Sequence, residues 1–163
     1  MDMQRVDKLK DIYRLEQHPE GGWFSECYTS ADSKDGRAMA GSIYFMLIGD
    51  GLSHFHEIDC EELWYHHEGC AVRITSIFDG KIEQFYLGSD IDKSERAMIA
   101  IPKGAIFAAE NLDKSGYCFM SCATSPKFTY DGFRLVGESE IRSICGQEAD
   151  KILYLAYSDE EIN

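Results

Sequence analysis

Nine short runs of β-branched and aromatic residues succeed one another along most of this chain, and this pattern constrains the fold more than any other feature. Turn signals such as Gly21-Gly22 and Asp79-Gly80 separate the runs. Short runs that recur at spacings of roughly ten residues are typical of β-sandwiches and small barrels. The runs cover residues 23–29, 40–48, 63–65, 71–78, 81–87, 96–101, 105–109, 117–123 and 133–136. We therefore expect an all-β fold.

Both ends of the chain depart from the strand pattern. Near the start, apolar residues recur at helical spacing and Pro19 follows them, which predicts an N-terminal helix over residues 3–16. Near the end, residues 139–145 are typical of a short helix that has Ser139 as its N-cap and stops at Gly146. Beyond this helix the pattern leaves helix and strand open.

Length and charge limit the function classes. A chain of 163 residues has the size of one domain, which we take as residues 1–163. It carries 16 Lys and Arg against 29 Asp and Glu, a formal charge of −13, and its basic residues form no cluster. Because such a surface repels phosphate backbones and anionic lipids, we expect no nucleic-acid partner and no membrane partner.

The start of the chain and the cysteines indicate a compartment. Residues 1–15 hold several charged side chains and no apolar run, so they match neither a secretory signal nor a membrane span. The six cysteines include no C-x-x-C pair, which favours reduced, buried thiols. We therefore expect a cytoplasmic protein.

The densest group of titratable residues lies within residues 49–69, which hold four of the five histidines. In an extended strand His54 and His56 point to the same face, where a carboxylate from the next strand, Glu61 or Glu62, can meet them. Two imidazoles and one carboxylate are a common ligand set for a divalent metal, and without metal they can move a proton. Two surface histidines beside a solvated acidic loop would give the same pattern.

These residues resemble the signatures of the cupins, whose fold is a small jelly-roll barrel, or double-stranded β-helix. The pair His54 and His56, followed by a glutamate and a glycine, resembles the first cupin signature. Residues 102–111 resemble the second signature at every position but one, because Phe107 stands where metal-binding cupins have a histidine ligand. The resemblance therefore implies a cupin barrel in which at most three protein ligands remain for a metal.

A wider set of segments, within about residues 12–136, resembles an uncharacterised cupin subfamily. This subfamily is similar in fold to the dTDP-sugar epimerases, which act by acid–base chemistry without metal. The resemblance implies a homodimer, as do the exposed edge strands of an open jelly roll. The matching segments are 18–24, 42–45, Phe55-His56, Glu62 with Trp64, 102–109, and Cys122 with Pro126 and Phe128. The residues that depart from the subfamily pattern are Lys127, Gly132 and Arg134.

The first signature leaves the choice of carboxylate open. A gap of four residues between the histidine and the glutamate selects Glu61, whereas a gap of six residues between the glutamate and the glycine selects Glu62. The subfamily pattern places a glutamate two residues before a tryptophan and so favours Glu62. Trp64 and His66 then lie on the same strand face as Glu62.

The run at residues 23–29 supplies two further candidates. If Phe24 faces the lumen, then Glu26 and Tyr28 face it as well, because side chains of a strand alternate. A carboxylate and a phenol would then line the pocket. A solvated Glu26 and a packed Tyr28 fit the same pattern.

Three functions remain. The first is a cofactor-free isomerase or epimerase of a sugar-like or carbonyl compound, in which His56 is the base, Glu62 orients it and Tyr28 donates a proton. The second is a metal-dependent cupin that holds a divalent ion through His54, His56 and Glu62. The third is a non-catalytic cupin that binds a small molecule. The expected ligand-binding residues are Glu26, His54, Trp64, His66 and Phe107.

Overall fold

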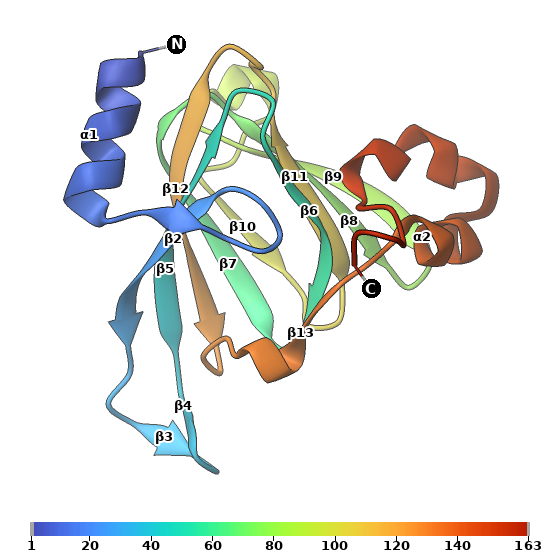
Figure 1. The fold of residues 1–163 in the computed structure, drawn as a ribbon, viewed down its shortest axis with the longest axis horizontal. Coiled ribbons are helices and arrows are strands. Elements are labelled where there is room, and N and C mark those ends of the chain that lie inside the picture. Colours follow the sequence, from blue (N-terminus) through green and yellow to red (C-terminus); the bar gives the residue numbers. More distant parts are fainter. Residues whose placement is uncertain (1, 163) are drawn as a thin grey trace.

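The computed structural model describes residues 2–162 and contains two antiparallel sheets that pack face to face (Figure 1). The first sheet contains, in spatial order, β1 (Glu16–Gln17), β2 (Trp23–Thr29), β5 (Gly41–Ile48), β12 (Tyr117–Ser125), β7 (Glu61–Gly69) and β10 (Met98–Ile101). The second contains β13 (Phe133–Leu135), β6 (Leu52–Ile58), β11 (Ile106–Asn111), β8 (Val72–Phe78) and β9 (Lys81–Leu87). Because the chain passes between the sheets from β5 to β6, β7 and β8, the topology is the expected jelly roll.

A small hairpin stands apart from the two sheets. Its strands are β3 (Ser33–Lys34) and β4 (Arg37–Ala38), and it projects away from the barrel in Figure 1. The Arg37 guanidinium at its base donates two hydrogen bonds of 2.8 Å to the Asp59 carboxylate. This bidentate pair ties the hairpin to the end of β6.

Some strand predictions match the structure closely, whereas others are incomplete. The runs at 23–29 and 81–87 coincide with β2 and β9. The run at 63–65 is only the centre of β7, which extends to both sides through charged and histidine residues. Strand β6 was not among the nine runs. Composition misses such segments because one face of the strand is polar.

The core lies between the sheets and fills one end of the barrel. It combines inward side chains from both sheets, of which Phe45, Trp64, Ile74, Phe107 and Met120 are among the largest that are fully buried. Burial of side chains of this size is the main favourable term in folding, at about 1.5–3 kcal/mol each. The opposite end of the barrel, where β5 and β7 begin, stays open.

Helix α1 (Met3–Tyr13) covers the outer face of the six-stranded sheet. Val6 and Leu9 are its buried residues, and they pack against Met46 and Phe119. The helix ends three residues before the predicted limit of 16, because Arg14 adopts a left-handed conformation and closes the last turn.

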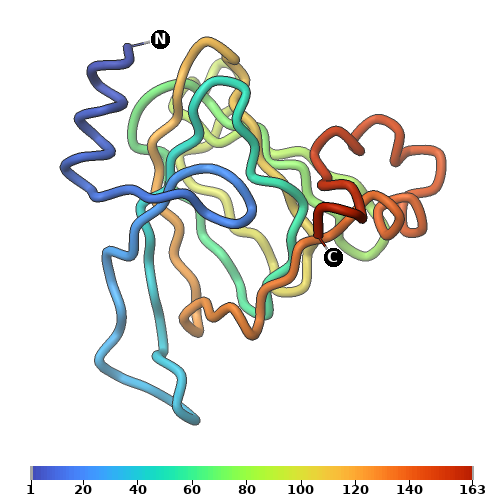
Figure 2. The backbone as a smooth tube through the Cα atoms, viewed as in Figure 1, coloured from blue at the N-terminus to red at the C-terminus, as the bar shows by residue number. Residues whose placement is uncertain are grey.

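The C-terminal segment covers the outer face of the other sheet, on the opposite side of the barrel from α1 (Figure 2). It contains α2 (Glu138–Cys145) and the 3-10 turns η3 (Gly146–Lys151) and η4 (Leu153–Leu155). The prediction that Ser139 caps α2 is wrong: Gly137 occupies that position, and the Ser139 hydroxyl donates to Asp159 instead. The predicted stop at Gly146 is confirmed.

Contact between α2 and the sheet should contribute measurably to stability. Ile141 is fully buried among residues of β6, β8 and β11, whereas Ile144 of the same helix is 39% exposed. We expect Ile141→Ala to lower the free energy of unfolding by about 2–5 kcal/mol, because it leaves a cavity, and Ile144→Ala to cost much less. Urea unfolding followed by circular dichroism measures both. Equal losses for the two variants would show that α2 does not pack as described.

Candidate functional site

A cavity of about 540 Å³ occupies the open end of the barrel. One part of its wall is apolar and largely aromatic, and its members are Phe24, Ile43, Phe45, Ile58, Trp64 and Phe128. The titratable groups that face it most deeply are His18, Glu20, His56 and Glu62. An enclosed apolar pocket with a few convergent polar groups is the usual form of a small-molecule site.

The loop of residues 18–22 carries two of these groups into the barrel. Within the loop, the Gly21 N–H donates to the His18 carbonyl over 2.9 Å, and the Glu20 carbonyl accepts from the His54 N–H of β6 over 2.7 Å. Gly21 has φ of +101°, and a Cβ there would lie 2.0 Å from the Leu52 carbonyl oxygen. Only glycine therefore lets the loop lie this close to β6.

His56 is buried and held as a neutral base. Its Nδ1 lies 2.7 Å from the His54 carbonyl oxygen. Because a carbonyl can only accept, Nδ1 carries the proton and Nε2 keeps its lone pair in the neutral ring. Burial lowers the pKa of His56. The Nε2 atom lies 3.3 Å from a carboxylate oxygen of Glu20.

Glu20 joins the two histidines of the cavity. One of its oxygens accepts from the Ser53 hydroxyl over 2.8 Å. The other lies 3.3 Å from His56 Nε2 and 3.4 Å from His18 Nδ1. Burial raises the pKa of Glu20 and lowers that of His18. A carboxylate and an imidazole whose pKa values move toward each other are suited to share one proton.

Glu62 faces the same cavity from β7. Its carboxylate accepts a 2.8 Å hydrogen bond from Trp64 Nε1. Burial, together with the nearby charge of Glu20, raises the pKa of Glu62 to about 7. A carboxyl group whose pKa lies near neutral can both donate and accept a proton. Its neighbour Glu61 is exposed, so Glu62 is the carboxylate of the cavity.

His54 does not join His56 in the lumen, and the expectation that it lies beside His56 is wrong. The register of β6 against β11 shifts by one residue between Ser53 and His56, which is a β-bulge. The bulge breaks the alternation of side chains on which the prediction depended. The His54 ring stacks instead on Tyr157 of the C-terminal segment, with ring centroids 3.7 Å apart.

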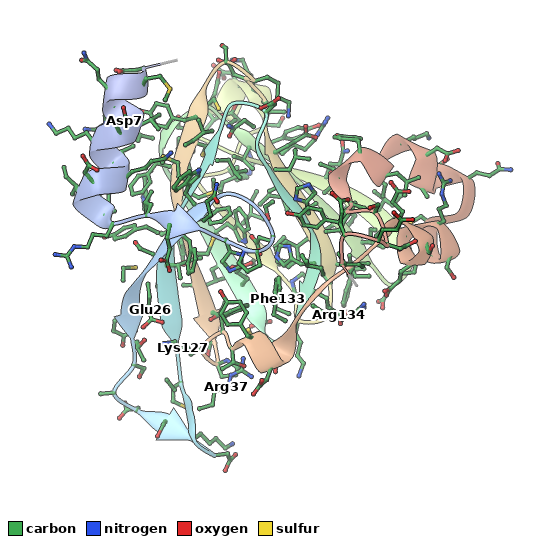
Figure 3. All side chains as sticks on the ribbon, viewed as in Figure 1. Asp7, Glu26, Arg37, Lys127, Phe133 and Arg134 are labelled. Atoms are coloured by element: carbon green, nitrogen blue, oxygen red, sulfur yellow. The ribbon has the colours of Figure 1, made fainter. Side chains whose placement is uncertain are left out.

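A second bulge separates Glu26 from Tyr28. The register of β2 against β5 shifts between these two residues, so they do not share a face. Tyr28 is 55% exposed and does not line the cavity, so the prediction that it donates a proton there is wrong. Glu26 lies at the mouth of the cavity, where its carboxylate is 2.5 Å from Lys127 Nζ (Figure 3).

The other predicted binding residues differ in their access to the cavity. Trp64 lines it, whereas His66 and Phe107 do not. His66 lies further along β7, and its buried Nε2 has no hydrogen-bond partner within the described part of the chain. Phe107 is fully buried behind His56, with ring centroids 4.2 Å apart. It therefore supports the imidazole, and the expectation that Phe107 contacts a ligand is wrong.

Of the three departures from the subfamily pattern, only Lys127 reaches the cavity. Arg134 of β13 lies outside it and pairs with Glu57 of β6 and Glu140 of α2 (Figure 3). Sequence reasoning missed Lys127, Glu20 and His18 as site residues. For Glu20 a signal was available in the sequence, namely the two glycines that follow it. A glycine turn can fold back sharply and so direct a neighbouring side chain into the barrel.

A jelly-roll barrel with a ligand-sized cavity at one end is the architecture of the cupins. A family model described as "Cupin superfamily (DUF985)" matches residues 7–136, and the chain belongs to this family. Comparison with curated proteins gives no significant match.

Solved structures agree with the family assignment. Protein SO0799 from Shewanella oneidensis is 30% identical, with a TM-score of 0.89 over 94% of this chain and 98% of that chain. A hypothetical protein from Leishmania major is 25% identical, with a TM-score of 0.86 over 94% and 99% of the two chains. Oxalate decarboxylase from Bacillus subtilis, at 14% identity and a TM-score of 0.57, covers 89% of this chain and 37% of its own length. This last similarity concerns the fold alone.

The metal site that the sequence predicted is not formed in the cavity. His54 is turned outward, and a phenylalanine stands where the further histidine of the second signature would be. Across residues 2–162, no three His, Cys, Asp or Glu side chains are arranged so that they could hold a metal ion. The predicted set of His54, His56 and Glu62 is therefore not assembled.

Residues 2–162 include no helix that is both long and apolar enough to span a membrane.

The raised pKa of Glu62 makes stability depend on pH. Because the folded protein binds this proton more tightly than the unfolded chain does, the contribution of Glu62 to stability is lost as pH rises from about 4.5 through 7. Relative to Glu62→Gln, the wild-type protein should lose about 2–3 kcal/mol of unfolding free energy between pH 5 and pH 8. Urea unfolding at several pH values measures this. Glu61→Gln is the matched control, and a difference from wild type that stays constant with pH for Glu62→Gln would contradict the assignment.

Proposed function

We propose that this cupin binds a small carbonyl compound and isomerises or epimerises it by acid–base chemistry that needs no metal. The observation that carries the proposal is the placement of a neutral, buried His56 in contact with one carboxylate and in the same cavity as a second. A base and an acid whose pKa values are displaced by burial are what proton transfer next to a carbonyl requires.

The proposed reaction moves two protons and forms no covalent bond to the protein. The pair of His56 and Glu20 removes a proton from the carbon next to the substrate carbonyl. The electron pair of that C–H bond moves toward the carbonyl oxygen, which takes the proton of Glu62. Return of the proton to the former carbonyl carbon, with loss of the proton of the neighbouring hydroxyl group to Glu62, gives the isomer. Return to the opposite face of the original carbon, with loss of the enol proton to Glu62, gives the epimer.

This assignment changes the roles that the sequence suggested. Glu20, and not Glu62, is the carboxylate next to His56 Nε2, and it stabilises the imidazolium that forms when His56 takes a proton. Glu62 then serves as the acid, the role first given to Tyr28. Trp64 positions Glu62 through its indole N–H.

Two further expectations remain proposals of the same kind. A homodimer would cover exposed apolar side chains on the six-stranded sheet, where Tyr65 and Met98 pair across β7 and β10. A cytoplasmic location suits the thiols, of which Cys60, Cys118 and Cys122 are buried and unpaired.

The chemistry can be tested by exchange with solvent deuterium. We expect the protein to exchange the proton next to the carbonyl of a small hydroxy-aldehyde or hydroxy-ketone in D₂O, as followed by proton NMR. His56→Gln and Glu62→Gln should each lower the rate by about 10²–10⁴-fold, the usual contribution of a general acid or base. Glu61→Gln, on the exposed side of the same strand, should keep the wild-type rate.

A ligand that binds but whose proton next to the carbonyl does not exchange with solvent would favour the non-catalytic cupin. In that case titration calorimetry would show binding to the wild-type protein, and no proton next to the carbonyl would exchange above the rate in buffer. Loss of exchange in Glu61→Gln to the same extent as in Glu62→Gln would also contradict the mechanism.

The position of Phe107 makes a separate prediction about metal. Phe107→His would place another imidazole directly against His56 and so add a nitrogen ligand at the position that the second cupin signature gives to histidine. We expect this variant to bind Zn²⁺ or Mn²⁺ at least about tenfold more tightly than the wild-type protein does. Titration calorimetry with the metal salts measures it, with Phe107→Leu as the control. Equal affinity of the wild-type protein and Phe107→His would contradict the prediction.

A further inference from the structure

The cavity has an uneven distribution of charge. Four of its lining residues are glutamates, namely Glu16, Glu20, Glu26 and Glu62. Lys127 is the single lysine or arginine in the described lining, and its ammonium group is already paired with Glu26 and hydrogen-bonded to the Thr29 hydroxyl. A ligand that enters the cavity therefore meets carboxyl groups and no free lysine or arginine in the described lining.

The hydrogen-bond donors near the buried end are also engaged. Trp64 Nε1 donates to Glu62, and the Ser42 hydroxyl donates to the Cys122 carbonyl over 2.8 Å. His56 has committed its Nδ1 proton to a backbone carbonyl, which leaves Nε2 as an acceptor. Apart from the carboxyl proton of Glu62, these groups offer acceptors, and the described lining has no free lysine or arginine of the kind with which proteins bind phosphate or carboxylate groups.

The aromatic wall of the cavity, formed by Phe128, Tyr130 and the His18 ring, is suited to a flat apolar surface. Phe128 and Tyr130 both line the cavity and pack edge to face, with ring centroids 5.2 Å apart. The His18 ring lies nearly parallel to that of Tyr130, at 6.1 Å and 19°. These rings offer apolar surface to a ligand, and carboxyl groups lie close beside them.

From charge, donors and shape together we propose that the ligand is an uncharged, hydroxylated carbonyl compound, a free sugar or sugar-like molecule that bears no phosphate or carboxylate group. Its hydroxyl groups donate to the acceptors of the cavity, its carbonyl oxygen meets the Glu62 carboxyl group, and its C–H face lies on the aromatic wall. The proposal rests on the proposed function, because it names the substrate class of the same site. The proposal therefore excludes nucleotide-linked sugars and small dicarboxylates as ligands of this cavity, because both classes are negatively charged.

The direct test compares matched pairs of ligands on the wild-type protein. The pairs are D-glucose with D-glucose 6-phosphate, D-fructose with D-fructose 6-phosphate, and D-glyceraldehyde with its 3-phosphate. Saturation-transfer NMR with competition measures the relative affinities at millimolar concentration. We expect at least one neutral member to bind, and its phosphate to bind at least about tenfold more weakly, because the added charges face carboxylates in a poorly solvated cavity.

Variants at the mouth test the cause of this preference. Glu26→Gln frees Lys127 from its ion pair, so the phosphorylated ligand should bind more tightly. The ratio of the affinity for the neutral ligand to that for its phosphate should fall by at least about threefold. Glu61→Gln removes one negative charge from an exposed site outside the cavity and should leave the ratio unchanged. Both variants carry the same change in net charge, so a general surface effect would alter the two ratios equally.

Several outcomes overturn the inference. They are equal or tighter binding of the phosphate, binding of no neutral sugar at millimolar concentration, and at least about tenfold tighter binding of D-glucosamine than of D-glucose, which would indicate a cation site. The proposed function fails separately. If a neutral sugar binds as expected and its proton next to the carbonyl never exchanges, the ligand class stands and the acid–base reaction does not. If exchange occurs only with phosphorylated compounds, the reaction stands and the ligand class does not.

Discussion

The close contact between the glycine turn of residues 18–22 and strand β6 governs what this barrel can do. The contact consists of a backbone hydrogen bond from the His54 N–H to the Glu20 carbonyl and of a Gly21 Cα that lies against the Leu52 carbonyl. It fixes the Glu20 side chain inside the barrel, next to His56. A side chain at Gly21 would push the loop outward, and the carboxylate that completes the site would leave with it.

The cost of burying carboxyl groups explains the electrostatic state of the cavity. A charged carboxylate is expensive to remove from water, and the cavity holds two, of which both have a pKa raised by burial and Glu62 has its pKa raised further by the charge of Glu20. Protonation, the neutral histidines and the hydrogen bonds from Ser53 and Trp64 offset that cost. The same arrangement that lowers stability as pH rises keeps an acid and a base available near neutral pH, which is a common compromise at functional sites.

The relation to other cupins illustrates how one barrel serves different chemistry. Oxalate decarboxylase shares the fold at low sequence identity, and that fold alone does not transfer an activity. Two local changes separate this cavity from a metal site. Phe107 replaces a donor with an apolar ring that supports His56, and the bulge in β6 turns His54 toward the C-terminal segment. The segment that receives His54 lies beyond the residues matched by the family model, so residues outside the family region also shape the loop and its surroundings.

The strand pattern, the turn glycines and the two cupin signatures were enough to predict a jelly-roll barrel with helices at both ends, because apolar alternation and turn chemistry are local properties. The sequence also favoured Glu62 over Glu61. What it could not determine were the bulges in β2 and β6, which depend on how neighbouring strands align and which moved Tyr28 and His54 out of the lumen. The partnership of Glu20 with His56 was equally inaccessible, because it joins residues 36 positions apart through a loop contact that exists only in the folded barrel.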